Sequence, residues 1–163
     1  YKILGIGNAL VEVLVQVEDE LILSELNIPK GSMQLIDTKR YLEIQKRFAS
    51  LHQQRTTGGS ACNTILAIAH LGGEPGLIGK VGKDEPAAFF SANCQKYGIA
   101  AQLLEDSQLP TGVASTIITA DGQRTFGTYL GAAATLQTAD IRPEWFEGYS
   151  YFYIEGYLVQ NHD

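Results

Sequence analysis

Short apolar runs and amphipathic stretches alternate along much of the chain. The predicted strands are the apolar runs 3–6, 76–82, 101–104 and 151–156. The predicted helices are 19–26, 38–52, 61–71, 85–97 and 140–146. In the second helix, Tyr41, Ile44 and Phe48 fall on one face at helical spacing. Because short buried strands that alternate with helices are typical of parallel sheets, the pattern predicts an α/β fold.

A second group of strand patterns does not alternate with helices. These strands are inserted at about 11–17, 31–36 and 112–129, and the last range contains two strands joined by the turn Asp121-Gly122. An Asp-Gly pair between two strand patterns is a strong signal for a β-hairpin. We therefore expect a small antiparallel sheet set apart from the α/β body.

The stretch from Thr56 to Gly73 combines a diglycine with the start of a helix. Glycines at 58 and 59 allow positive φ and let a ligand approach the main chain closely. Ser60 is placed to cap the helix that follows, and Asn63 lies about 200° around that helix from the apolar Ile65. This combination predicts a surface for hydroxyls or an anion. An ordinary strand-to-helix turn with a capping serine fits the same residues.

Two acidic residues stand out because they belong to apolar strand patterns. Glu12 lies among Val and Leu residues, where a carboxylate costs free energy unless it is paired or lies at a cavity. Glu155 ends the last predicted strand, and open α/β sheets bind ligands at that end. Both are candidate binding residues. The alternative for Glu12 is a solvent-facing strand position, and the alternative for Glu155 is a helix-capping or solvent-facing carboxylate.

Composition and charge exclude several classes of protein. Of the 163 residues, 45% are hydrophobic and 18% are charged, which is ordinary for a globular domain. The net charge is −6 and Lys and Arg do not cluster, so we expect no nucleic-acid partner. No apolar run approaches the ~18 residues of a membrane-spanning helix, and no signal-peptide pattern is present. We therefore expect a soluble, cytoplasmic protein with no membrane partner.

The few cysteine and histidine residues do not form a recognisable site. Cys62 and Cys94 have no disulfide or metal-ligand spacing, and Cys62 is best interpreted as a small buried thiol. His52, His70 and His162 are far apart in the sequence. They build neither a Ser/His/Asp set nor a metal site, so we expect no metal ligand in this chain.

Four segments, taken in order, resemble the ribokinase-type (PfkB) carbohydrate kinases. They are Gly7-Asn8-Ala9-Leu10-Val11-Glu12, Gly58-Gly59-Ser60-Ala61-Cys62-Asn63, Gly79-Lys80-Val81-Gly82-Lys83-Asp84 and Asp121-Gly122-Gln123-Arg124-Thr125. The phrases at 7–11 and 29–33 are similar to the adenosine-kinase-like branch. The resemblance implies a Rossmann-like ribokinase fold, of which residues 1–163 are the N-terminal half. It also implies that the small antiparallel sheet is a lid over the substrate.

The resemblance further implies transfer of the ATP γ-phosphoryl group, with Mg²⁺, to a primary hydroxyl of a sugar or nucleoside. The implied substrate-binding residues are Asn8, Glu12, Met33, Gly58, Gly59, Asn63 and Glu155. Among these, Asn8 and Glu12 would face the substrate, and Met33 would cover its ring or base. Glu12 departs from the family, which usually has Asp there. Its carboxylate is displaced by about one C–C bond length, so a shifted or smaller substrate is one consequence.

The second half of the family's fold has no counterpart in residues 1–163. It holds the glycine-rich anion hole, the catalytic base and the ATP pocket, all of which phosphoryl transfer needs. The resemblance therefore implies that the catalytic base follows Asp163, the last residue of the sequence. We expect this segment alone to bind substrate without turnover, and to contain no catalytic residue.

Two alternatives to the kinase interpretation remain open. The first is a non-catalytic sugar- or nucleoside-binding pseudokinase. The second is a module that forms a homodimer through its lid strands.

Overall fold

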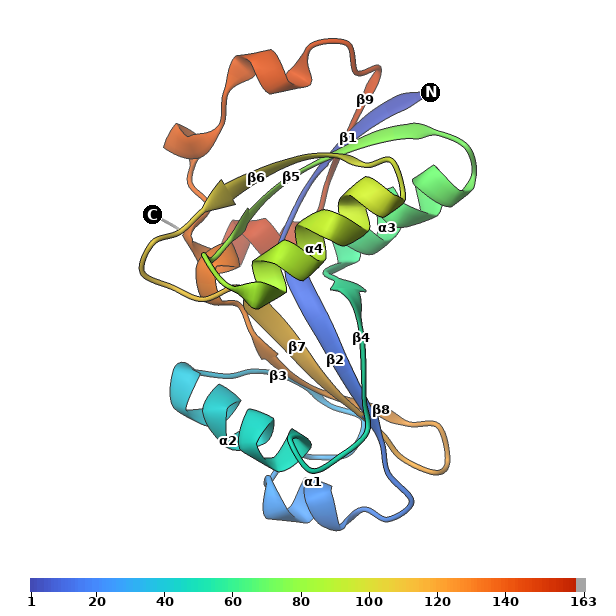
Figure 1. The fold of residues 1–163 in the computed structure, drawn as a ribbon, viewed down its shortest axis with the longest axis vertical. Coiled ribbons are helices and arrows are strands. Elements are labelled where there is room, and N and C mark those ends of the chain that lie inside the picture. The colour runs from blue at the N-terminus through green and yellow to red at the C-terminus, as the bar shows by residue number, and fades with distance from the viewer. Residues whose placement is uncertain (161–163) are drawn as a thin grey trace.

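The computed structural model describes residues 1–160 and shows two sheets joined end to end (Figure 1). The first, here called the body sheet, is parallel and has the strand order β6-β5-β1-β9. Its strands are β1 (Lys2–Ile6), β5 (Glu74–Val81), β6 (Ala100–Glu105) and β9 (Tyr151–Ile154). The α/β body predicted from the apolar runs is therefore present.

Two helices cover one face of the body sheet (Figure 1). They are α3 (Ser60–His70) and α4 (Glu85–Lys96). Close approach of α3 to β1 depends on Gly5, because a Cβ there would lie 2.7 Å from Cγ1 of Ile65. On the opposite face, Leu4, Ile6 and Ile78 pack against side chains from residues 136–158, a region that is largely made of 3-10 segments. These segments are η1 (Gly131–Thr135), η2 (Thr138–Asp140), η3 (Pro143–Phe146) and η4 (Gly156–Gln160).

The second sheet, here called the lid sheet, has five strands in the order β3-β8-β7-β2-β4. They are β2 (Leu10–Gln16), β3 (Met33–Leu35), β4 (Gln53–Gly58), β7 (Gly112–Ile118) and β8 (Arg124–Tyr129). The predicted hairpin is confirmed by the antiparallel pair β7–β8, and β2–β4 is also antiparallel. The pairs β2–β7 and β3–β8 are parallel, so the sheet is mixed and the expectation of an antiparallel sheet was wrong. The hairpin turn determines the antiparallel direction of β7 and β8 only. Strands from segments distant in the sequence can pair in either direction.

Two helices pack on one face of the lid sheet, and they are α1 (Leu21–Glu25) and α2 (Thr38–Phe48). Asp37 caps α2 as its side chain accepts a hydrogen bond from the Arg40 amide at 2.8 Å. Ile44 and Phe48 are fully buried beneath the sheet, in keeping with the predicted apolar face. Helices α1 and α2 therefore leave the opposite face of the lid sheet uncovered.

Several element boundaries differ from the sequence prediction. Helix α2 ends at Phe48, and β4 follows where no strand was predicted, because the polar run Gln-Gln-Arg-Thr-Thr lacks apolar alternation. This strand lies at the edge of the sheet and is fastened to α4 by Arg55, which contacts both Glu85 carboxylate oxygens at 3.0 and 2.8 Å. Proline at 143 opens a short 3-10 turn in place of the α-helix predicted over 140–146.

The last strand, β9, was predicted to be buried, and the structure shows an exposed edge. Tyr151 and Ile154 are 57% and 60% exposed, and within the described residues β9 pairs only with β1. Apolar composition alone does not distinguish a central strand from an edge strand.

Two residues named in the sequence analysis, His162 and Asp163, lie outside the described residues. The structure therefore does not test what was expected of them. The expectation that the catalytic base follows Asp163 stays a prediction.

The chain passes from one sheet to the other at 7–9, 59, 106–111 and 130. Each sheet is consequently assembled from segments that are far apart in the sequence. Among residues 1–160, no helix has the length and apolar character needed to cross a membrane.

Candidate functional site

A cavity of about 340 Å³ lies where the two sheets meet. All seven predicted binding residues line it, and they are Asn8, Glu12, Met33, Gly58, Gly59, Asn63 and Glu155. They come from the ends of β1, β4 and β9, from the start of α3 and from the lid strands β2 and β3. Segments distributed over the whole chain thus converge on one space.

The bend at Gly59 determines how the main chain enters the cavity. Gly59 has φ +91°, and a Cβ there would lie 2.1 Å from the carbonyl oxygen of Asn8. Only glycine fits both this φ and this contact. Gly59 is itself the N-cap of α3, so the expectation that Ser60 caps the helix was wrong. The positive φ of Gly59 begins the helix one residue earlier, and Ser60 becomes its first helical residue.

Glu12 lies on the cavity face of β2 and is paired. Its side chain is only 12% exposed, and its Oε1 accepts hydrogen bonds from the Thr116 hydroxyl at 2.9 Å and from the Arg124 guanidinium. The alternative of a solvent-facing strand position is therefore excluded for Glu12. These partners offset the cost of burying a carboxylate among apolar residues.

Asn63 lies in the first turn of α3, exposed and facing the same cavity as Glu12. The opposite, apolar side of the helix buries Ile65, as the helical spacing predicted. An amide carries two N–H donors and an acceptor, whereas an ionised carboxylate only accepts. Asn63 and Glu12 therefore offer complementary hydrogen-bonding groups to a ligand.

Glu155 is tied to the start of α3. Its Oε2 accepts a hydrogen bond from the Ser60 hydroxyl, and its Oε1 accepts one from the Tyr153 hydroxyl at 2.8 Å. The Thr64 hydroxyl lies 3.3 Å from that of Tyr153 and extends the network along the helix. A carboxylate near the first turn of a helix also gains from the helix dipole. Glu155 is thus held at the rim of the cavity, which excludes a free solvent-facing carboxylate. Its donors among the described residues are hydroxyls and not amides of α3, so Glu155 does not cap the helix either.

The lid supplies an apolar wall that the sequence prediction covered only at Met33. Met33 and Leu35 are 53% and 55% exposed on β3, and Phe126 lies beside them on β8. A period of two places Arg124, Phe126 and Thr128 on one face of β8, and all three line the cavity. This alternation could have identified Arg124 and Phe126 from the sequence, and the same period of two from Met33 could have identified Leu35 on β3.

The cysteines do not take part in this chemistry. Cys62 and Cys94 are buried and reduced, and burial raises the pKa of the Cys62 thiol to about 12 and that of Cys94 to about 11. The interpretation of Cys62 as a small buried thiol is confirmed. Both thiols are protonated at neutral pH and are poor nucleophiles.

Residues 1–160 include no group of three His, Cys, Asp or Glu side chains able to hold a metal ion. The two carboxylates in the cavity, Glu12 and Glu155, already have protein partners. Among residues 1–160, these side chains therefore do not form a Mg²⁺ site. No step of phosphoryl transfer is assigned to these side chains.

Comparison with known proteins matches residues 31–163 to the pfkB family carbohydrate kinases. Aminoimidazole riboside kinase from Salmonella typhimurium is 37% identical over 100 residues, which are 59% of this chain and 30% of that protein. Adenosine kinase 2 from Arabidopsis thaliana is 24% identical over 164 residues, which are 96% of this chain and 47% of that protein.

Solved structures show the same relationship over nearly the whole chain. The adenosine kinase from Sinorhizobium meliloti has a TM-score of 0.84 at 33% identity, and covers 98% of this chain with 48% of its own. A probable sugar kinase from Rhizobium etli CFN 42 has a TM-score of 0.86 at 30% identity, with the same coverage. The chain spans about half the length of these relatives. Its two-sheet α/β structure is a partial ribokinase-like fold, and the chain belongs to the pfkB family of carbohydrate kinases.

Proposed function

We propose that this chain is the substrate-binding half and lid of an ATP-dependent kinase that phosphorylates a primary hydroxyl of a nucleoside or sugar. The observation that carries the proposal is the convergence of Asn8, Glu12, Asn63 and Glu155 with the Gly58–Gly59 main chain around one cavity. Carboxylates accept hydroxyl protons and amides both donate and accept, so this set is suited to the vicinal hydroxyls of a sugar ring.

The apolar wall favours a nucleoside over a free sugar. Met33, Leu35 and Phe126 offer apolar and aromatic surface to a flat heterocycle, on the lid side of the cavity. A free sugar has no heterocycle and would leave this apolar surface in contact with water. Two relatives are named for substrates that join a ribosyl group to a planar base, namely adenosine and aminoimidazole riboside. A ribonucleoside is therefore the proposed substrate.

Chemistry on this substrate needs groups beyond the described residues. Phosphoryl transfer depends on a base that reaches the attacking hydroxyl and on cations that stabilise the transferred group. We propose that these groups, with ATP and Mg²⁺, are supplied by the remainder of a longer protein, beyond Asp163. Residues 1–163 alone are then expected to bind the nucleoside and to release no ADP.

The test is ADP formation by the complete protein with a panel of nucleosides, pentoses and hexoses. We expect turnover with a ribonucleoside, and a loss of about 10- to 100-fold in kcat/KM in Asn63→Ala, from one or two hydrogen bonds. The variant Lys39→Met, which alters an exposed lid residue outside the cavity, serves as the control. Binding of a nucleoside without ADP formation for any compound would favour the pseudokinase alternative.

Dimerisation through the lid stays a separate proposal. Within the described residues, β3 and β4 each pair on one side only and form the edges of the lid sheet. Unpaired strand edges are able to pair with a second chain. Sedimentation of the complete protein over a range of concentrations tests this idea, and a monomer mass throughout would contradict it.

A further inference from the structure

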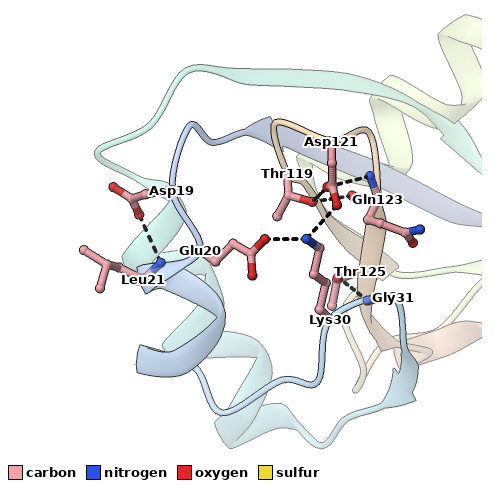
Figure 2. Close-up of polar contacts among 9 residues, drawn as sticks. All are labelled: Asp19, Glu20, Leu21, Lys30, Gly31, Thr119, Asp121, Gln123 and Thr125. Atoms are coloured by element: carbon pink, nitrogen blue, oxygen red, sulfur yellow. Dashed lines mark hydrogen bonds and ion pairs between the residues drawn. The ribbon is translucent and has the colours of Figure 1, made fainter.

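An ion-pair cluster outside the cavity joins three segments of the lid (Figure 2). The Lys30 ammonium donates to Oδ2 of Asp121 at 2.7 Å and also to the Glu20 carboxylate. Lys30 precedes β3, Asp121 lies in the β7–β8 turn, and Glu20 precedes α1. Lys30 and Asp121 are 91 residues apart in the sequence, so this contact links distant parts of the chain.

The turn presents Asp121 in a fixed orientation. Its Oδ1 accepts hydrogen bonds from the Thr119 hydroxyl at 2.6 Å and from the Gln123 amide at 3.3 Å. The Gly122 amide also donates to the Thr119 carbonyl at 2.8 Å and closes the turn. One carboxylate oxygen thus stiffens the hairpin and leaves the other directed at Lys30. The partner of Lys30 is therefore preorganised, which lowers the entropy cost of the pair.

The two residues after Lys30 continue the attachment. The Gly31 amide donates to the Thr125 hydroxyl at 2.9 Å, and the Ser32 carbonyl accepts from the Phe126 amide at 2.8 Å. Residues 30–32 are therefore fastened one after another to the β8 side of the hairpin. Strand β3 begins at the next residue, Met33.

Strand β3 is short, and beyond it the Ile36 amide donates to the Thr128 carbonyl of β8 at 2.9 Å. Strand β3 is three residues long, and within residues 1–160 it pairs only with β8, in the register Met33↔Phe126, Gln34↔Gly127 and Leu35↔Thr128. Met33 and Leu35 remain more than half exposed because they face the cavity and not a packed core. So short an edge strand gains little from its own ladder, and its position depends on the segments that anchor its ends.

We propose that Lys30 is a positioning residue that, through Asp121, anchors β3 and so fixes the distance of Met33 and Leu35 from a ligand in the cavity. Lys30 does not line the cavity and acts only through these side chains. The part of the inference that concerns ligand affinity rests on the proposed nucleoside function. The part that concerns the order of β3 does not.

The experiment compares Lys30→Met, Lys30→Arg and Lys39→Met in the complete protein. Methionine removes the charge and keeps much of the aliphatic stem, arginine restores the charge, and Lys39 is an exposed lid residue that forms no ion pair with residues 1–160. Amide hydrogen exchange of residues 33–35 is measured without ligand. Adenosine is the probe for KM and kcat.

In Lys30→Met we expect the β3 amides to exchange at least about fivefold faster than in the wild type. The exchange rates of the β7 amides should be unchanged, since local opening free energies differ between elements. KM for adenosine should rise about three- to tenfold, and kcat should stay within about twofold of the wild-type value. This is the result expected when binding of the ground state and of the transition state is weakened equally. Lys30→Arg should restore both values, and Lys39→Met should alter neither. Added salt should move wild type toward Lys30→Met because exposed pairs are screened.

Unchanged exchange of the β3 amides in Lys30→Met would overturn the inference. A similar increase in Lys39→Met, or a failure of Lys30→Arg to restore protection, would overturn it as well. Faster exchange with an unchanged KM in an enzyme that phosphorylates adenosine would refute the role in ligand binding. Faster exchange that Lys30→Arg reverses, in a protein that phosphorylates no nucleoside, would support the anchoring of β3 and count against the proposed function.

Discussion

Arg124 and Glu12 form an ion pair across the cavity face of the lid, between strands that are not neighbours. Arg124 is on β8 and Glu12 is on β2, and β7 lies between these strands. The pair therefore spans β7, whose Thr116 adds a hydrogen bond to the same Glu12 oxygen. The other oxygen of Glu12, Oε2, accepts no hydrogen bond from residues 1–160. Under the proposed function, this oxygen would accept a hydroxyl proton of the ligand.

Replacement of Glu12 by glutamine is expected to weaken nucleoside binding about 10- to 100-fold, since a hydrogen bond to a charged group contributes about 1.5–3 kcal/mol. The free energy of unfolding should change by less than about 1 kcal/mol, because Arg124 is partly exposed and the pair is screened. Titration calorimetry and urea unfolding of the complete protein measure the two quantities. Glu18→Gln, at an exposed position just beyond β2, is the control. Equal affinity of Glu12→Gln and wild type would contradict a role in binding.

Gly59→Ala is expected to destabilise the protein by more than the left-handed backbone alone costs. The φ of +91° carries a penalty of about 1–2 kcal/mol for a residue with a Cβ, and the clash with the Asn8 carbonyl adds to it. Gly72→Ala is a matched control, as Gly72 has φ +81° and no described atom within 4 Å of an added Cβ. Thermal unfolding should show a clearly larger loss for Gly59→Ala. If Gly59→Ala and Gly72→Ala lost equal thermal stability, the clash with the Asn8 carbonyl would be relieved without a cost in free energy.

The sequence was sufficient to predict the elements whose pattern is local. The apolar face of α2 and the Asp121-Gly122 hairpin both follow from spacing within a few residues, and the structure contains both of them. Glu12, Gly58, Gly59, Asn63 and Glu155 were candidates from the sequence pattern itself, whereas Asn8 and Met33 came only from the resemblance to the PfkB kinases. The structure places them around one cavity, and their roles in binding stay predictions.

Two of the wrong expectations depend on contacts between segments distant in the sequence. The polar strand β4 forms because β2 and α4 are there to receive it, and its own residues carry no strand pattern. The parallel pairing of β2 with β7 joins segments about 100 residues apart. The Ser60 cap failed for a local reason, because the positive φ of Gly59 begins α3 one residue earlier.

Cys62 and Cys94 are expected to be unreactive in the folded protein. Burial keeps both thiols protonated up to a pH near their raised pKa values of about 12 and about 11. Labelling with a chromogenic disulfide reagent at pH 8 should modify neither cysteine in the native state and both in guanidinium chloride. Fast labelling of Cys62 in the native protein would show that α3 opens locally.

The stability that Asp121 contributes is expected to persist well into the acid range. Hydrogen bonds from Lys30 and then Thr119 lower the pKa of Asp121 from 3.8 to about 2. Because the folded pKa lies below the unfolded one, this contribution is fully present above pH 3.8 and is lost as the pH falls through about 2. The stability difference between wild type and Asp121→Asn should thus be constant from pH 7 to about 5 and shrink between pH 4 and 2. A difference that already declines at pH 6 would identify another titrating group.

The four chain passages between the sheets, at 7–9, 59, 106–111 and 130, have a mechanical consequence. Any rotation of the lid against the body must be absorbed by torsions at these points. Asn8, Gly59 and Leu130 belong to the passages and also line the cavity. A molecule held in the cavity would therefore contact the same residues whose torsions set the angle between the two sheets.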